Sequence, residues 1–253
     1  MSEVVAPESV DPPVTLHIGF LLMPEYTLST FANAIGILRL ANRLTDRALY
    51  RWSIYSVDGE SVVSSAGLEM KVDGRLDPEQ SMHILMVCGG YRIKDHCNKH
   101  VSDALRRLAK NKIALGALCT GSYVLAAAGL LNGYRCTIHW ENLASMREEF
   151  PSLQICSSLF VIDRDRYTCS GGISSIDLML NLVASIHGHQ LVQQISDQFT
   201  CDRVRTEKDA QRAPLQYLIG ASQPRLVDAV SLMESNIEEP LTLDEVADYV
   251  GIS

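Results

Sequence analysis

Residues 113–123 read IALGALCTGSY, an apolar run that ends at a cysteine and passes directly into a helix-like stretch. A strand buried on both faces of a parallel sheet appears as a continuous apolar run, so we expect a central strand over Lys112–Ala117. Val124–Ala128 then continue as a helix. Cys119 is therefore expected on the turn between strand and helix, over the free N–H groups of the helix start. Open α/β sheets bind ligands at this place.

Three interpretations of Cys119 are open from these residues alone. The strand–turn–helix geometry is that of a nucleophile elbow, so the thiol could be a catalytic nucleophile, which needs a base and an orienting acid. Free cysteine is also a common buried structural residue. The interpretation we favour is the floor of a small-molecule pocket that has kept the elbow without the chemistry.

The composition is that of a folded soluble protein. The 253 residues suffice for one sizeable α/β domain and a small second one. A formal charge of −8 argues against a broad nucleic-acid surface, so any DNA contact must come from a small part of the chain. The seven cysteines are scattered, odd in number and never in a CxxC pair, which indicates reduced thiols in a cytoplasm. The sequence contains no apolar run of membrane-spanning length and no signal-peptide pattern, so no membrane partner is expected.

The chain up to residue 212 alternates short apolar runs with helical patterns after a disordered lead-in over residues 1–14. The expected strands are 15–23, 51–57, 82–87, 112–117 and a hairpin of 159–163 with 166–169, and the expected helices are 31–41, 96–110, 141–150, 174–187 and 190–200. This alternation predicts an α/β fold with a doubly wound, mainly parallel sheet covered on both faces.

The last thirty residues have a different character and follow a linker. Residues 213–224 are typical of a linker. An amphipathic helix follows from Leu226, and Thr242 with Glu245 forms a capping box before a second helix over 243–250. Residues 251–253 would be the turn of a helix-turn-helix whose second helix should start next.

Several motifs in this order resemble a known family. They are Arg39–Leu44, Gly116–Gly121, Leu125–Gly133, Thr137–Trp140, Gln211–Pro214, Pro240–Ala247 and Gly251–Ser253. Together they resemble AraC-type transcription regulators with an amidotransferase-like sensor domain of the ThiJ/PfpI type. The resemblance covers residues 15–253, and the joint order of the motifs is more specific than any one of them.

The resemblance implies a flavodoxin-like front domain that senses a small metabolite and helix-turn-helix units that bind DNA. The best understood members respond to arginine or to quaternary amines such as glycine betaine and carnitine. We therefore expect a ligand-sensing domain over 15–212, a linker over 213–224 and a truncated all-α DNA-binding domain over 225–253. The expected partners are a small effector, promoter DNA and a second copy of the chain in a homodimer.

The sequence departs from the enzymes of this fold. Thr27 occupies the position of the acidic residue that polarises the cysteine, with Glu25 nearby but offset, and Thr120 follows the cysteine where the enzymes tend to have a histidine. Gly36-Ile37 replaces the Glu-Pro that relatives often carry. We expect no catalysis, no cofactor and no metal. The alternative is a cysteine-dependent amidase, glyoxalase or deglycase that uses Cys119 and His139.

The expected ligand site lies around the elbow. Its candidate residues are Gly90, Tyr91, Cys119, Thr120, Tyr123, His139, Trp140 and Glu141. The backbone N–H groups of Gly90 and Thr120 correspond to an oxyanion hole and are suited to a carboxylate.

The other candidates are suited to the opposite end of such a ligand. Tyr91, Tyr123 and Trp140 would form an aromatic wall for a methylated ammonium group. His139 would donate a hydrogen bond or serve as a base, and Glu141 would supply a counter-charge. The simpler alternatives are a glycine turn, rim aromatics and an exposed carboxylate.

A second set of polar residues has the spacing of a metal site. His96 and His100 stand four residues apart on the helix expected over 96–110. This spacing can hold a metal on one face of a helix, but the sequence offers no third ligand. We interpret the pair as an exposed polar helix face.

Overall fold

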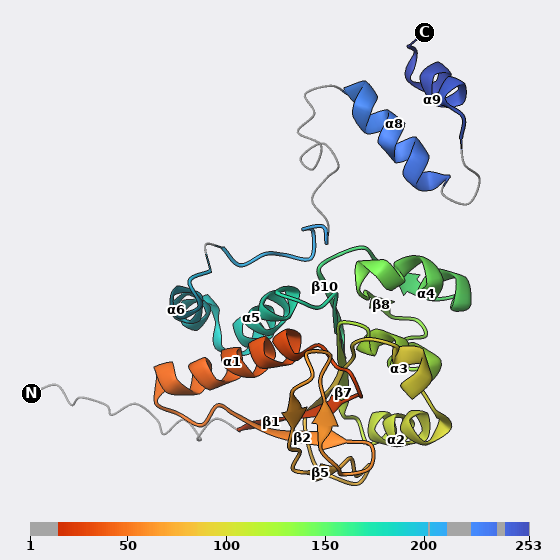
Figure 1. Ribbon diagram of the computed structural model, residues 1–253. Coiled ribbons are helices and arrows are strands. Elements are labelled where there is room, and N and C mark those ends of the chain that lie inside the picture. The colour runs from red at the N-terminus through yellow and green to blue at the C-terminus, as the bar shows by residue number, and fades with distance from the viewer. Residues whose placement is uncertain (1–14, 202, 212–223, 237–240, 253) are drawn as a thin grey trace, which may run out of the picture. The chain divides into compact units, whose positions relative to one another are not determined.

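The computed structural model describes residues 15–201, 203–211, 224–236 and 241–252 (Figure 1). The chain divides into two compact units, residues 1–209 and 210–253. The expected lead-in over 1–14 and the expected linker up to residue 223 lie outside the described residues.

The first unit is built on one seven-stranded sheet. Its strands are β1 (Leu16–Leu22), β2 (Tyr50–Ser56), β5 (Gly74–Arg75), β6 (Ile84–Cys88), β7 (Ala114–Leu118), β10 (Phe160–Asp163) and β11 (Arg166–Cys169). They lie in the order β10-β11-β7-β6-β1-β2-β5. Every neighbouring pair is parallel except the hairpin of β10 and β11 at one edge. The predicted mainly parallel sheet is confirmed.

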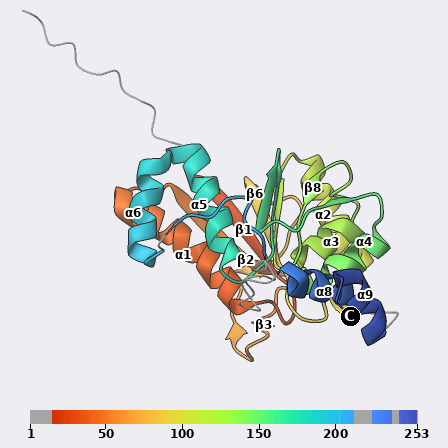
Figure 2. The same ribbon diagram turned by 90° about the horizontal axis from the view of Figure 1, so that it is seen from above.

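Helices cover both faces of this sheet. They are α1 (Leu28–Thr45), α2 (Lys99–Lys110), α3 (Gly121–Ala127), α4 (Leu143–Glu149), α5 (Ser174–His187) and α6 (His189–Phe199). Helices α1, α5 and α6 lie on one face and α2, α3 and α4 on the other (Figures 1 and 2). Each face has its own apolar core cluster. The doubly wound architecture follows from this alternation of buried strands and amphipathic helices.

Short elements complete the first unit. They are the ribbon of β3 (Val62–Val63) and β4 (Glu69–Met70), the pair β8 (Arg135–Cys136) and β9 (Gln154–Ile155), and the 3-10 turns η1 (Ile93–His96) and η2 (Trp140–Asn142). The ribbon is connected to the loop after β1, because the Glu25 N–H donates to the Val63 carbonyl at 2.9 Å.

The predicted helix over 96–110 is wrong at its start. The chain forms η1 up to His96, and α2 begins only at Lys99 because the Asn98 side chain accepts from the Val101 N–H and caps the helix. His96 and His100 therefore do not share a helix face. The His96 imidazole lies 3.6 Å from a Glu25 carboxylate oxygen, whereas His100 contacts the Arg75 guanidinium. Within the described ranges, no three His, Cys, Asp or Glu side chains are grouped to hold a metal ion.

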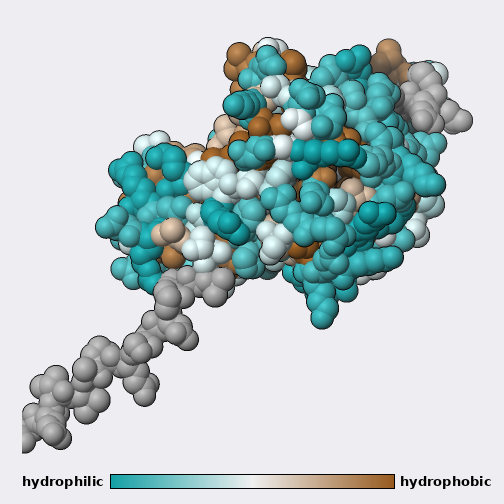
Figure 3. Space-filling view, turned by 90° about the horizontal axis from the view of Figure 1, so that it is seen from below, coloured by the Kyte–Doolittle hydropathy of each residue, from teal (hydrophilic) through white to brown (hydrophobic). Residues whose placement is uncertain are grey.

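The surface seen in Figure 3 is mainly hydrophilic, with apolar residues in separate patches. Among the helices of the described residues, none is both long enough and apolar enough to cross a membrane.

The second unit contains two described helices, α8 (Pro224–Ser235) and α9 (Leu243–Val250). Ala229, Val246 and Val250 are buried and form its small apolar core. The predicted capping box is confirmed, because the Thr242 hydroxyl accepts from the Glu245 N–H and the Glu245 carboxylate accepts from the Thr242 N–H. Gly251 ends α9 in the left-handed conformation that favours glycine.

Candidate functional site

Cys119 stands on the turn directly after β7 with a φ of +59°. A left-handed conformation at a residue with a side chain is strained. Close backbone packing holds this turn. A Cβ atom on Gly171 would lie 2.8 Å from the Cys119 sulfur, and one on Gly90 would lie 1.8 Å from the Glu25 carbonyl oxygen. The residues around the thiol therefore form a nucleophile-elbow geometry.

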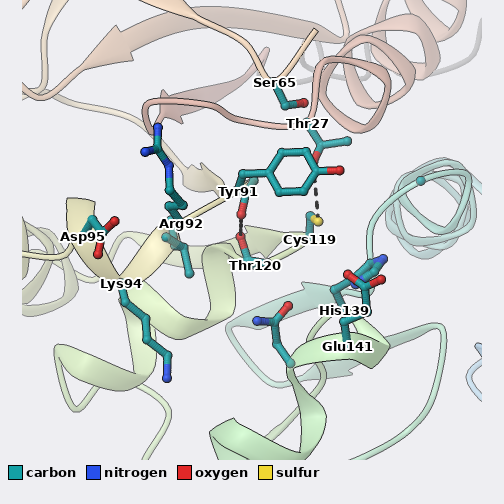
Figure 4. Close-up of a pocket in the computed structure, with 14 residues that line it drawn as sticks. Thr27, Ser65, Tyr91, Arg92, Lys94, Asp95, Cys119, Thr120, His139 and Glu141 are labelled. Carbon is teal, nitrogen blue, oxygen red and sulfur yellow. Dashed lines mark hydrogen bonds and ion pairs between the residues drawn. The ribbon is translucent and has the colours of Figure 1, made fainter.

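A cavity of about 550 Å³ opens over this turn (Figure 4). Loops that follow β1, β6, β7 and β11 all contribute to its wall. It therefore lies at the carboxyl ends of parallel strands, where open α/β sheets bind ligands. Its volume is within the range of sites for small metabolites.

The structure brings six of the eight expected site residues to this cavity. They are Gly90, Tyr91, Cys119, Thr120, His139 and Glu141. Tyr123 and Trp140 are not among the lining residues. The Tyr123 hydroxyl donates to Glu149 at 2.8 Å and its ring packs on Phe150.

The expected wall of three aromatic rings is wrong, because Tyr91 alone of the three rings lines the cavity. The Trp140 ring lies beside the His139 ring instead, with 5.7 Å between centroids.

The surroundings of the Cys119 thiol favour its neutral form. Its residue is 7% exposed, and burial raises the pKa of this thiol. The Thr27 hydroxyl, which donates to the sulfur at 3.5 Å, and the Thr120 N–H lower the pKa in part, whereas the Glu141 charge raises it. The net direction is upward. A catalytic thiol shows the opposite shift, because the thiolate is the nucleophile.

His139 is not arranged as a base for this thiol. Its Nδ1 atom lies 3.7 Å from a Glu141 carboxylate oxygen. Among the described residues, no hydrogen bond joins the imidazole to Cys119, and the side chain that donates to the sulfur is Thr27. Thr27, at the position where an enzyme is expected to carry an acidic residue, thus places a hydroxyl against the sulfur.

The floor beside the thiol presents backbone N–H groups. The Thr120 hydroxyl donates to the Gly90 carbonyl at 2.7 Å, and the Tyr91 N–H donates to the Glu25 carbonyl at 3.2 Å. The first bond fixes the loop after β6 to the elbow, and the second fixes it to the loop after β1. The Gly90 N–H donates to no group in the described part of the chain, and the Thr120 N–H faces the sulfur. Such paired donors are suited to a carboxylate or another small anion.

Sequence reasoning missed most of the charged rim. Arg92, Lys94 and Asp95 follow Gly90 on the loop after β6 and line the cavity with Glu141. Figure 4 shows Arg92 across the cavity from His139 and Glu141. The sequence could have indicated these residues. They follow Gly89-Gly90 after a predicted parallel strand, and the loop after such a strand is expected at the same sheet edge as Cys119.

The two cations of the rim are already paired with carboxylates outside the lining. Arg92 binds Glu25 through two bonds of 2.8 and 2.5 Å, and these bonds lower the pKa of the Glu25 carboxyl. Lys94 binds Glu149. The rim carboxylates that remain are Asp95 and Glu141, so the charge that the rim presents to the cavity is mainly negative.

Comparisons with known proteins agree with this geometry. The DJ-1/PfpI family profile matches residues 28–185. The HTH-type transcriptional regulator CdhR of Pseudomonas aeruginosa is 40% identical over 234 residues, which cover 92% of this chain and 69% of CdhR. The chain belongs to the HTH-type transcriptional regulators with a DJ-1/PfpI domain.

Other members of this family support the assignment. The regulator GbdR of Pseudomonas aeruginosa is 45% identical over 236 residues, which cover 93% of this chain but 64% of GbdR. The chain thus spans less than two thirds of that relative. The crystal structure of an AraC family transcriptional regulator from Pseudomonas putida superposes with a TM-score of 0.67 at 30% identity, covering 73% of this chain and 99% of that one.

The fold also occurs in an enzyme. The isonitrile hydratase of Pseudomonas putida is 27% identical over 185 residues, which cover 72% of this chain and 77% of the hydratase. Family membership by itself therefore does not decide between ligand binding and catalysis, and the geometry of the site has to decide.

Proposed function

We propose that this chain is the effector-sensing part of a transcription regulator. In this proposal the cavity over Cys119 binds a small metabolite reversibly and transforms nothing. The observation that carries it is an elbow whose thiol lacks the features of a nucleophile. The thiol has a raised pKa and a threonine hydroxyl as its partner, and no imidazole of the described residues is bonded to it. The similarity to proteins named as transcriptional regulators supports the same conclusion.

The charges of the cavity favour an effector with a carboxylate at one end and a cation at the other. The floor offers the N–H groups of Gly90 and Thr120 to the carboxylate. The rim offers the Glu141 carboxylate and the Tyr91 ring to an ammonium or methylated ammonium group. We therefore propose an amino acid or a quaternary amine such as arginine, glycine betaine or carnitine.

The proposed arrangement places sensing in residues 15–212, a linker in 213–224 and DNA contact in the helix-turn-helix part from 225 onward. The capped helix α9 supports the last assignment, because such a helix followed by a glycine turn begins a helix-turn-helix. A homodimer in the cytoplasm and promoter DNA as partner belong to the same proposal. Effector binding would act by favouring one arrangement of the regulator over another.

Calorimetric titration tests the proposal directly. The compounds are L-arginine, glycine betaine, carnitine and dimethylglycine, with acetate and tetramethylammonium as matched controls that each carry one end of the effector. We expect saturable heat with at least one of the four and weaker or no heat with the controls. Flat traces for all four compounds, from protein shown to be folded, would contradict sensing.

The alternative function is that of an enzyme, which the elbow geometry and the similarity to isonitrile hydratase support. It requires Cys119 to act as a nucleophile with His139 as its base. Cys119→Ser separates the two functions, because binding needs the cavity whereas turnover needs the thiolate. We expect the variant to retain effector affinity. Release of a product by the wild type that stops in Cys119→Ser would establish the enzyme instead.

A further inference from the structure

The first unit ends in a segment, residues 203–209, that runs across α5 to the edge strand β10 (Figure 1). We call this segment the strap. It has no helix or strand of its own. The Asp177 carboxylate attaches it to α5 and its own Glu207 carboxylate attaches it to β10, whereas the Asp209 carboxylate bonds Thr206 within the strap. The second unit begins at the residue after it. Anything that moves the strap therefore acts on the start of the connection to the second unit.

The attachment to α5 is a partly buried ion pair between Asp177 and Arg205. The Asp177 side chain is 5% exposed and that of Arg205 is 24% exposed. One carboxylate oxygen accepts from the Arg205 backbone N–H at 3.0 Å, and the other accepts from Nε at 3.0 Å and from a terminal guanidinium nitrogen at 2.6 Å. Both the backbone and the side chain of the strap are thus fixed to one carboxylate. Removing the Arg205 guanidinium leaves the buried Asp177 carboxylate without its charged partner.

The far end of the strap is attached to the edge of the sheet. One Glu207 carboxylate oxygen accepts from the Ile162 N–H at 2.9 Å, and the other pairs with Arg135 at 3.2 Å. The Leu159 N–H donates to the Asp209 carbonyl at 3.2 Å. These contacts use N–H groups beside and within β10 that an edge strand would otherwise expose. The strap position is therefore defined at both ends.

The anchor on α5 lies one helical turn from the cavity. Helix α5 starts at Ser174, one residue after the Gly171–Gly172 loop, and Asp177 is in its first turn. Gly172 lines the cavity, its N–H donates to the Thr30 hydroxyl at 2.9 Å, and its carbonyl accepts from Ser175 at 2.9 Å. One hydrogen-bonded helical turn thus connects the glycine loop to the Asp177 carboxylate.

We propose that the Asp177–Arg205 pair couples the cavity to the strap. A molecule seated on the cavity floor contacts the Gly171–Gly172 loop, displaces the first turn of α5 and thereby moves the strap that leads to the second unit. This inference rests on the proposed sensing function for the identity of the molecule, but the mechanical link is a property of the first unit alone. By thermodynamic reciprocity, a change at the strap must also change affinity at the cavity.

The link is tested first without any effector. Gly172→Ala strains the loop at a φ of +59° without a clash, and Gly129→Ala is the matched control, with a φ of +73° and its nearest contact at 3.7 Å. The readout is hydrogen exchange of the Arg205 amide, which is bonded to Asp177. We expect Gly172→Ala to change this rate about threefold or more and Gly129→Ala to leave it unchanged. Equal rates in both variants would overturn the coupling.

The second test uses the compounds titrated above. Arg205→Lys removes the paired guanidinium bonds, and Arg203→Lys is its control on the same strap, where Arg203 binds Asp209 at 2.5 Å. We expect Arg205→Lys to change the affinity for the compound that binds by about fivefold or more, although Arg205 is outside the cavity lining. Unchanged affinity contradicts the coupling. If no compound binds, the proposed function fails. Hydrogen exchange of the Arg205 amide then still decides whether the cavity is coupled to the strap.

Discussion

The floor of the cavity is buried and uncharged, whereas its rim is exposed and carries four charged side chains. On the floor, Cys119 lies neutral between the backbone of Gly171 and the hydroxyl of Thr27. On the rim, Arg92 and Lys94 are neutralised from outside the cavity, which leaves Asp95 and Glu141 facing it. Close contacts determine the shape of the floor, and charged side chains determine the electrostatic character of the rim.

This difference separates two properties that a sensor needs. Close backbone packing gives the floor one shape, because a protein interior tolerates little change in volume. Charges on an exposed rim change affinity and specificity at small cost in stability, because solvent screens them. Substitutions on the floor should therefore alter folding, and substitutions on the rim should alter binding.

The largest expected effect is on the floor. A Cβ atom on Gly90 would lie 1.8 Å from the Glu25 carbonyl oxygen, so the backbone itself has to move in Gly90→Ala. We expect the free energy of unfolding in urea to fall by about 3 kcal/mol. Gly67→Ala is the control, because Gly67 has a φ of +77° but no atom within 4 Å of the added carbon. Similar losses in the two variants would show that the floor is not close-packed.

The next effect concerns the buried thiols below the floor. Cys169 is fully buried, and burial raises the pKa of its thiol from 9.0 to about 11. A group whose pKa is raised in the folded state stabilises the fold below its unfolded value and loses this contribution as the pH rises through the folded value. The free energy of unfolding should therefore fall by about 2 kcal/mol more between pH 9 and pH 11 in the wild type than in Cys169→Ala. Parallel pH profiles would contradict the burial of a neutral thiol.

On the rim the expected effect is on affinity alone. Glu141→Gln removes one of the carboxylates that face the cavity, so the affinity for a cationic effector should fall about threefold to tenfold in calorimetry. Glu148→Gln is the matched control, because Glu148 is exposed on α4 outside the lining. The difference between the two variants should shrink as salt is added. An equal loss in both would mean that the rim acts only through net charge.

The smallest expected effect is on the thiol itself. The hydrogen bond from Thr27 lowers the pKa of Cys119, so Thr27→Val should raise that pKa further. The pH dependence of iodoacetamide labelling, followed by mass spectrometry of the peptide with Cys119, should move to higher pH, with little change in unfolding free energy. A shift to lower pH would show that Thr27 does not donate to the sulfur.

Much of the fold follows from local sequence patterns. The apolar run before Cys119 forms β7, and its residues from Leu115 onward are buried. The spacing of Phe31, Ala34, Leu38 and Ala41 marks the face of α1 that the structure buries. Such patterns are readable because strands and helices impose their periods on neighbouring residues.

The predictions that were wrong or missing depended on single side chains or on contacts formed only in the folded chain. The start of α2 moved to Lys99 because a single capping side chain, Asn98, decided it. Tyr123 follows the elbow closely in sequence, yet its ring packs on Phe150 and not on the cavity. The residues 203–209 have a charged pattern from which no partner can be inferred, and their attachment to Asp177 appears only in the folded chain.

The sequence by itself determined the parallel α/β architecture, the elbow at Cys119 and the capped helix at Thr242, because these depend on residues a few positions apart. The tertiary structure decided which side chains line the cavity, the neutral state of the thiol and the neutralisation of Arg92 by Glu25, a residue 67 positions away. Burial and Coulomb interactions depend on distances in space, and a linear order of residues does not contain those distances.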